Sequence, residues 1–377
     1  MSDPQSAGRH GALHTRACDL FGVEFPIVQT GMGWVSGARL TAATSAAGGL
    51  GILASATMTV GELADAIAKV RERTDKPFGV NLLPSQPDAA ERISLIVEAG
   101  VPVASFAAAP RPEQVDRLRQ AGVATVVTVG APRHAQKVAG MGVSAVIAQG
   151  GEGGGHTGTI PTALLVPGVV EAVTSLEGEA ADMVVLAAGG MRDGIGLAGA
   201  LAWGAHGIAM GTRFLLTAES QVPDHVKDVY IASGLTSTVV TTAIDGAPQR
   251  VIRTEVIDEL ERSKGPMRLS RAAANALRFA RQSGTSPLDL MRTARAMHSD
   301  QELTWAQVAL AANAPMMTKA SVVDGDLEVG ILPTGQVVGS IDDLPSVADL
   351  VEEIVTGADA ALTRLCSATG REHPEEI

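Results

Sequence analysis

Aromatic residues are scarce in this chain of 377 residues: they make up 3% of it, and there is a single tyrosine. Proteins that bind single-stranded nucleic acid stack bases on aromatic side chains, so this composition disfavours such a partner. Basic residues are also outnumbered, 29 against 41 acidic ones, which gives a net charge of -12 at pH 7. Phosphate backbones and anionic membrane surfaces would repel such a chain. We therefore expect neither a nucleic-acid partner nor a membrane partner.

Cysteines and long apolar runs are missing as well. Cys18 and Cys366 are the two cysteines, and they lie near opposite ends without any metal-ligand spacing. No window reaches the ~18 to 20 uncharged apolar residues of a membrane-spanning helix. Residues 1–18 lack the apolar core of a secretion signal and are small and polar. These absences predict a cytoplasmic protein without a metal site, in which residues 1–18 form a flexible leader.

Eight apolar, β-branched runs follow one another in the first 215 residues, and amphipathic stretches separate them. The runs span 26–31, 49–55, 78–83, 101–107, 123–130, 144–151, 183–190 and 207–214. Their continuous apolar character predicts strands buried on both faces, as in a parallel sheet covered by helices. Eight such units predict a (β/α)8 TIM barrel. A doubly wound open sheet is the alternative, but GMGWVSG after the first run lacks the GxGxxG spacing typical of that fold.

The alternation of strands and helices stops after residue 217. Residues 218–330 have a helical pattern rich in arginine, and residues 331–377 end in an amphipathic run that suits the last helix of a barrel. The sequence thus predicts a barrel made of 19–217 and 331–377. A helical substrate or lid domain, 218–330, would be inserted between strand 8 and the last helix, at the end of the barrel where active sites lie.

Glycines follow several of the predicted strands. Gly189 and Gly190 end the seventh strand, and Gly211 with Thr212 ends the eighth. The loops after these two strands commonly bind phosphate in TIM barrels. Their backbone amides and the Thr212 hydroxyl would donate hydrogen bonds to phosphate oxygens. Ordinary tight turns are the alternative.

Other strand ends offer a surface for a flat ring. Gly31 removes side-chain bulk after the first strand and Met32 adds an apolar surface, while Asn81 and Gln149 place amide groups at the ends of the third and sixth strands. A planar heterocycle with a phosphate tail fits this set better than a sugar or a metal ion, and FMN is the simplest such ligand. Because no dinucleotide fingerprint is present, NAD(P)H would bind only transiently, as an electron donor or acceptor.

The segment AQGGEGGGHTG, residues 148–158, keeps one histidine among six glycines directly after the sixth strand. The ordinary pKa of histidine lies near neutral pH, so its side chain can take or give a proton beside a hydride acceptor. His156 is therefore the candidate catalytic acid or base, although a histidine in a loop can also be a solvated bystander. Glu152 could orient His156 or simply cap the loop, and the sequence leaves both roles open.

Taken together, these motifs resemble the nitronate monooxygenase family, formerly called 2-nitropropane dioxygenases, which also includes flavin-dependent enoyl-acyl-carrier-protein reductases. The resemblance covers most of 19–360 and rests on PIVQTGMGWVSG, FGVNLL, AQGGEGGGHTG, AAGGMRDG and AMGTRF. It implies an FMN-binding barrel with a helical second domain, and His156 as the family's histidine. It also implies flavin contacts at Gly31, Met32, Asn81, Gly151, Gly189, Gly190, Gly211 and Thr212. Family members commonly have Ala-Pro-Met where this chain has Thr30-Gly31-Met32, a difference that speaks against nitronate oxidation.

A narrower resemblance concerns VQTGMGWVSGARL, VVTTAIDGAPQRVIRTE and ELTWAQVALAANAP. These segments look like the actinobacterial branch that serves steroid-ring catabolism, whose substrates are bicyclic acids carried as coenzyme A thioesters. The resemblance implies an FMN-dependent oxidoreductase that dehydrogenates or reduces a coenzyme A thioester in the degradation of cholesterol or bile-acid rings. The alternatives are oxidation of alkyl nitronates with O2, an NAD(P)H:quinone or enoyl-thioester reductase, and a non-catalytic FMN-binding protein.

An arginine-rich stretch offers an independent hint about the substrate. Between Arg250 and Arg295 lie ten basic residues and five acidic ones. Arg268, Arg271 and Arg278 have helical spacing and could share a face that binds the phosphates of coenzyme A. A solvated helix with incidental charge is the alternative. The sequence leaves open the direction of the reaction and the choice between a monomer and a homodimer.

Overall fold

The computed structural model describes residues 13–262 and 313–368 of the chain, which form two compact units. The first unit takes in the described residues up to Gly153, then Gly158–Gln221, and then those from Asp343 onwards. The second takes in Gly154–Thr157 and the described part of Val222–Asp342. The sequence predicted the second domain at 218–330, whereas the second unit begins at Val222, ends at Asp342 and also includes Gly154–Thr157.

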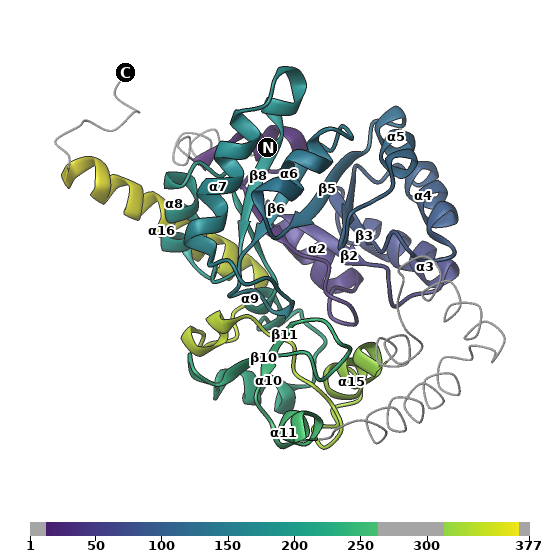
Figure 1. Ribbon diagram of the computed structural model, residues 1–377, viewed down its shortest axis with the longest axis vertical. Helices are drawn as coiled ribbons and strands as arrows, with labels where there is room; N and C mark the ends of the chain where they lie inside the picture. The colour runs from purple at the N-terminus through teal and green to yellow at the C-terminus, as the bar shows by residue number, and fades with distance from the viewer. Residues whose placement is uncertain (1–12, 263–312, 369–377) are drawn as a thin grey trace. The chain divides into compact units, whose positions relative to one another are not determined.

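Eight parallel strands close into the barrel of the first unit (Figure 1). They are β1 (Ile27–Gln29), β2 (Leu50–Ala54), β3 (Phe78–Leu82), β4 (Val103–Phe106), β5 (Ala124–Val129), β6 (Ala145–Gln149), β8 (Val184–Ala188) and β9 (Ile208–Met210). Each lies within one of the eight predicted runs, and β9 pairs with β1 to complete the ring. The predicted TIM barrel is confirmed.

Helices from the connecting segments cover this barrel (Figure 1). They are α2 (Ala38–Ala46), α3 (Val60–Arg71), α4 (Ala89–Glu98), α5 (Pro112–Gln120), α6 (Pro132–Ala139), α7 (Thr162–Thr174), α8 (Gly194–Ala202) and α16 (Val347–Ala368). The local sequence fixes where several helices start. Thr59 and Glu62 form a capping box at the start of α3, and proline is the first residue of α5 and of α6. The last helix, α16, packs against α8 and α2.

Small and branched side chains fill the barrel interior. They are Val28, Leu50, Ile52, Val103, Val126, Ala145, Ile147, Val184, Leu186, Ala188 and Ala209. Helix α1 (Arg16–Phe21) covers the amino end of the strands, because its Ala17 and Phe21 pack on this cluster. The predicted flexible leader therefore does not extend to residue 18: Leu13 and Ala17 are fully buried in the first unit.

The inserted segment is not only helical. In the second unit, β10 (Thr238–Thr241), β11 (Gln249–Ile252) and β7 (Gly155–His156) form an antiparallel sheet in the order β10, β11, β7. The described helices of this unit include α10 (Asp224–Ile231), α11 (Glu255–Arg262) and α15 (Asn313–Val322). The helical prediction missed the sheet for two reasons. β10 and β11 are short and partly polar, and β7 comes from a loop of the barrel.

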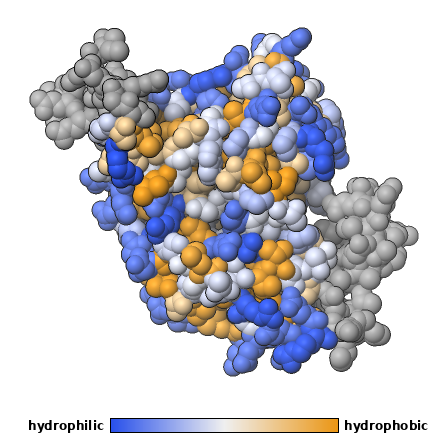
Figure 2. Space-filling model, turned by 60° about the vertical axis from the view of Figure 1, so that its left-hand side comes forward, coloured by the Kyte–Doolittle hydropathy of each residue, from blue (hydrophilic) through white to orange (hydrophobic). Residues whose placement is uncertain are grey.

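The surface is mostly hydrophilic on the face shown in Figure 2, with separate apolar patches among the polar side chains. In the first unit, Leu164, Ile195 and Leu365 are the most exposed large apolar side chains. Single exposed apolar residues are ordinary on protein surfaces and need no special explanation. None of the described helices combines the length and the apolar character that crossing a membrane requires.

Close packing of α8 on α16 depends on a glycine. A Cβ atom added to Gly194 would lie 2.2 Å from the Ala358 nitrogen and 2.4 Å from the Ile354 oxygen. We expect Gly194→Ala to lower the free energy of unfolding by about 1–3 kcal/mol, because the backbones of two helices would have to separate. Urea unfolding followed by circular dichroism measures this change.

Gly199 is the matched control, since it lies in α8 as well. A Cβ atom there would have nothing within 4 Å. Gly199→Ala should be neutral or stabilise the protein by roughly 0.5–1 kcal/mol, because alanine favours a helix over glycine. Equal losses in both variants would contradict the assignment of the helix contact to Gly194.

Candidate active site

The barrel interior changes from apolar to polar at the carboxyl ends of its strands. Side chains alternate along a strand, so the residues two positions after interior Val103, Val126 and Ile147 also face inward. These residues are Ser105, Thr128 and Gln149. Asn81 joins the layer from β3, since its Nδ2 lies 3.4 Å from Ser105 Oγ. Active sites of TIM barrels lie at this end, so the polar layer marks the candidate site.

The loop after β1 is held by two buried polar side chains. Gln29 is fully buried, and its Nε2 donates to Ser36 Oγ at 2.8 Å and to the Ile52 oxygen at 3.2 Å. Ser36 Oγ accepts from the Met32 amide at 2.8 Å and donates to the Thr30 oxygen at 2.9 Å. The backbone around the predicted flavin-binding residue Met32 is thus fixed by the protein itself.

Gln29 and Ser36 were not among the predicted site residues. A signal was available, because Gln29 interrupts an otherwise apolar strand and must find partners when buried. The same loop holds Trp34 with φ 66, the one left-handed backbone among the described residues other than glycine. Such strained residues cluster at functional sites.

The structure brings several predicted cofactor residues together in the first unit. Gly31 lies against Asn81, since a Cβ atom on this glycine would be 2.4 Å from Asn81 Cβ. Gly211 lies against Met32, whose Sδ would be 3.3 Å from an added Cβ. Because β9 and β1 are neighbours, these contacts join the loops after the first and eighth strands of the barrel. Gly31, Met32, Asn81 and Gly211 therefore form one stretch of the rim.

The loop after β8 has a backbone that only glycine adopts easily. Gly189 has φ 97 and Gly190 has φ 77. Gly189 is half-buried beneath Thr162, whose Oγ1 lies 3.1 Å from the Gly189 oxygen, whereas Gly190 is exposed. Thr212 begins the short helix α9 (Thr212–Leu215) after β9, the strand next to β8. The two loops predicted to bind phosphate are thus neighbours on the rim.

Three glycines of residues 148–158 make room for the protein rather than for a ligand. A Cβ atom on Gly150 would lie 2.5 Å from the Thr162 backbone, and one on Gly153 would lie 2.7 Å from the Gln149 side chain. A Cβ atom on Gly154 would lie 2.3 Å from the backbone of Thr334. Much of the glycine content of this segment is therefore required by internal packing.

Gly151 and Glu152 also have internal roles. The Gly151 amide donates to the Ile160 oxygen at 2.7 Å, so this amide is already used within the loop. Glu152 Oε2 accepts from the Thr162 amide at 2.9 Å and from its Oγ1 at 2.6 Å, which caps the start of α7. Of the two roles left open for Glu152, capping is the one that the structure shows.

His156 has a carboxylate partner, Asp245, within the second unit. His156 Nε2 lies 2.7 Å from Asp245 Oδ2, and the two side chains are 66% and 7% exposed. Asp245 Oδ1 accepts from the Ala247 amide at 3.1 Å, and Oδ2 also accepts from Gln249 Nε2 at 2.5 Å. His156 and Gln249 are paired residues of β7 and β11. A carboxylate fixed at both oxygens therefore holds an imidazole that reaches the surface.

The pKa of the Asp245 carboxyl lies below its ordinary value. Burial raises this pKa. The hydrogen bond and the charge of His156, the Ala247 amide and the Gln249 side chain lower it, and together they outweigh the effect of burial. Asp245 is therefore ionised at neutral pH and can only accept hydrogen bonds.

Asp245 and Gln249 were not predicted as site residues, although they lie in VVTTAIDGAPQRVIRTE. An Asp-Gly pair between two β-branched runs is a hairpin signal, and it predicts the turn between β10 and β11. No local pattern joins this turn to His156, which lies 89 residues earlier in the chain. The pairing of β7 with β11 brings the two together.

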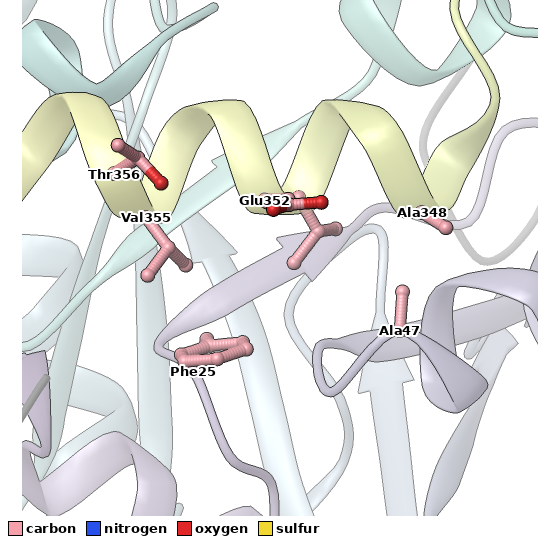
Figure 3. A pocket seen from close by; sticks show the side chains of 7 residues that line it. Phe25, Ala47, Ala348, Glu352, Val355 and Thr356 are labelled. Carbon is pink, nitrogen blue, oxygen red and sulfur yellow. The ribbon is translucent and has the colours of Figure 1, made fainter. Parts of the chain in front are cut away.

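A surface depression lies between α16 and the segments that carry Phe25 and Ala47 (Figure 3). It is lined by Phe25, Ala47, Ala348, Val351, Glu352, Val355 and Thr356. Phe25 precedes β1 and Ala47 follows α2, so the depression lies at the amino ends of the strands. Because TIM-barrel active sites lie at the carboxyl ends, we assign no catalytic role to it.

The predicted coenzyme A ligands Arg268, Arg271 and Arg278 lie outside the described residues. Their shared helix face stays a prediction. Within the described parts of the chain, no group of three or more His, Cys, Asp or Glu side chains could hold a metal ion.

Comparison with known proteins agrees with the barrel fold. The model of the family described as nitronate monooxygenase matches residues 14–357. The chain belongs to the nitronate monooxygenase family. It is therefore an oxidoreductase of a flavin-dependent family, as its motifs indicated.

Two relatives of this chain share one name, (3aS,4S,5R,7aS)-5-hydroxy-7a-methyl-1-oxo-octahydro-1H-indene-4-carboxyl-CoA dehydrogenase. That of Mycobacterium tuberculosis is 52% identical and that of Rhodococcus jostii 51% identical, each over 92% of this chain and 96% of the relative. FabK from Thermotoga maritima is a similar solved structure, with a TM-score of 0.75 and 32% identity over 94% of this chain and 99% of FabK. The narrower resemblance to coenzyme A thioester dehydrogenases is confirmed.

The lowered pKa of Asp245 makes the stability of the protein depend on pH. A carboxyl whose pKa is lower in the folded chain than its ordinary 3.8 stabilises the fold above that pH. This stabilisation is lost as pH falls through the folded pKa. We expect Asp245→Asn to lower the melting temperature at pH 7, and its difference from the wild type to shrink as the pH falls below the ordinary carboxyl pKa of 3.8.

Thermal unfolding followed by circular dichroism at several pH values measures this difference. Asp19→Asn is the control, because Asp19 is paired with His14 at 2.8 Å but is 70% exposed. Its effect should be small at every pH, since exposed ion pairs contribute little. A loss in Asp245→Asn that stays constant with pH would contradict the role given to the ionised carboxylate.

Proposed function

We propose that this protein is an FMN-dependent dehydrogenase of a hydroxylated, bicyclic coenzyme A thioester, with His156 as the acid or base. The pairing of a surface-reaching His156 with the buried Asp245 carries the proposal. The names of the two relatives support the substrate class. The phosphates of coenzyme A would be bound by Arg268, Arg271 and Arg278, and NAD(P) would serve as a transient second redox partner.

The rim of the barrel fits FMN in two respects. Neighbouring loops present the left-handed Gly189 and Gly190 and the helix start at Gly211 and Thr212, where backbone amides and a hydroxyl would bind the phosphate. Gly31, Met32, Asn81 and Gln149 would lie along the ring, next to the polar interior layer. FMN bound there would supply the hydride acceptor for the reaction.

Dehydrogenation of an alcohol removes a hydride from carbon and a proton from the hydroxyl group. We assign to His156 the role of accepting the hydroxyl proton. The hydrogen bond between Gly151 and Ile160 ties together the ends of the segment that carries His156. His156 is four residues from Ile160, so chain length limits the separation of their Cα atoms to about 14 Å. The chain thus connects His156 through a few residues to the loop that follows β6, which supports the assignment.

Oxidation of alkyl nitronates is the second candidate, because the matching family has this name. Thr30-Gly31-Met32 departs from the Ala-Pro-Met common in the family, and the loop built on it is tied to Gln29 and Ser36. We place this activity second for that reason.

Replacing His156 tests its proposed role directly. We expect His156→Ala to lower kcat/KM for the thioester by about 100-fold or more, because a positioned acid or base contributes about 10²–10⁴-fold. The amount of bound FMN should not change. His134→Ala removes an exposed histidine of α6 and is the matched control. Unchanged turnover in His156→Ala would remove His156 from the mechanism.

Thr212 tests the phosphate site. We expect Thr212→Val to raise the Kd for FMN by about 10-fold or more, because a hydrogen bond to a charged group contributes about 1.5–3 kcal/mol. The Kd for riboflavin, which has no phosphate, should stay the same. Fluorescence titration of the cofactor-free protein measures both constants. Thr174→Val, on the exposed side of α7, is the control. Equal weakening of both ligands by Thr212→Val would exclude a specific phosphate contact.

A further inference from the structure

We infer that Asp245 is a positioning residue that fixes the tautomer of His156, so that Nδ1 is the ring nitrogen that exchanges the proton. This inference rests on the proposed role of His156 and deepens it. Asp245 would act through His156, because it is buried and its carboxylate oxygens are occupied by protein groups.

The donors and acceptors around Asp245 define the tautomer. His156 Nε2 and Gln249 Nε2 lie 2.7 Å and 2.5 Å from Asp245 Oδ2, and they lie 3.3 Å from each other. The Gln249 amide nitrogen is a donor, and an ionised carboxylate only accepts. His156 Nε2 must therefore carry a hydrogen to bind Asp245. A neutral imidazole with its hydrogen on Nε2 has its lone pair on Nδ1.

The carboxylate is held independently of the histidine. Ala243 and Ile244, directly before Asp245, are buried in the core of the second unit. Gly246, directly after it, has φ 93, and its amide donates to the Thr242 oxygen at 3.1 Å. The turn therefore holds Asp245 in place without help from His156, and the carboxylate sets the orientation of the imidazole ring.

Gln249 makes the choice of tautomer depend strongly on Asp245. Without the carboxylate, the Gln249 Nε2 donor would be the nearest of these groups to His156 Nε2, 3.3 Å away. It would favour a lone pair on that nitrogen and move the hydrogen to Nδ1. Loss of Asp245 should thus reverse the tautomer rather than merely loosen the ring. A base with its hydrogen on the reacting nitrogen cannot accept a proton there.

Nitrogen NMR of the full-length protein observes the tautomer without any turnover. In protein labelled with ¹⁵N-histidine, loss of signals in His156→Gln identifies the ring of His156. Long-range ¹H–¹⁵N correlation of the wild type above neutral pH should show a protonated Nε2 and an unprotonated Nδ1. In Asp245→Ala the pattern should reverse, and in Asp19→Asn it should not change. The same tautomer in the wild type and Asp245→Ala would overturn the inference.

Asp245→Asn keeps the size of the side chain, should Asp245→Ala fail to fold. Its amide can turn either its oxygen or its nitrogen toward His156, so we expect the single tautomer to be lost. A wild-type NMR pattern in this variant would also count against the role of Asp245.

A double-mutant cycle separates positioning from a structural role. Asp245→Asn should lower kcat by about 100-fold or more with little change in KM, as expected for a lost acid or base. In a His156→Ala background, the same change should cost less than about 2-fold, because there is no imidazole left to position. Losses that multiply in the double variant would show a structural role instead. If His156→Ala alone leaves turnover unchanged, the proposed function fails, and the NMR result still decides what Asp245 does to the ring.

Discussion

Closure of the barrel by the pairing of β9 with β1 is the constraint on which the rest of the first unit depends. Eight parallel strands in a closed ring place all of their carboxyl ends on one rim. Asn81, Gln149, Gly189 and Gly211, far apart in sequence, come to lie on this one rim because the ring closes. The polar layer above an apolar interior follows from the same geometry, since strand alternation decides which side chains face inward.

A different interaction organises the second unit. The barrel loop after β6 contributes β7, and the pairing of this two-residue strand with β11 sets His156 opposite Gln249 and beside Asp245. The sheet thus assembles the candidate acid or base with a carboxylate that lies 89 residues away in the chain.

Much of the fold and part of the candidate site could be predicted from the sequence, and the features that were missed have physical causes. Long apolar runs gave the strands, because strands buried on both faces leave a strong signal. The sheet of the second unit was missed, since four-residue strands such as β10 carry little periodic information. His156 and the rim glycines were chosen from local motifs. Asp245, Gln249 and Ser36 were not, because their roles arise from tertiary contacts. The need for glycine at 150, 153 and 154 likewise arises from tertiary contacts, because the protein packs on itself there.

We propose that this chain oxidises a hydroxylated coenzyme A thioester with FMN held at the barrel rim. The most direct measurement is anaerobic mixing of the FMN-loaded protein with a hydroxylated, bicyclic coenzyme A thioester, or with an alkyl nitronate, while flavin absorbance is followed. We expect the thioester to bleach the flavin within the turnover time and the nitronate to do so much more slowly. Rapid bleaching by the nitronate with none by the thioester would contradict it.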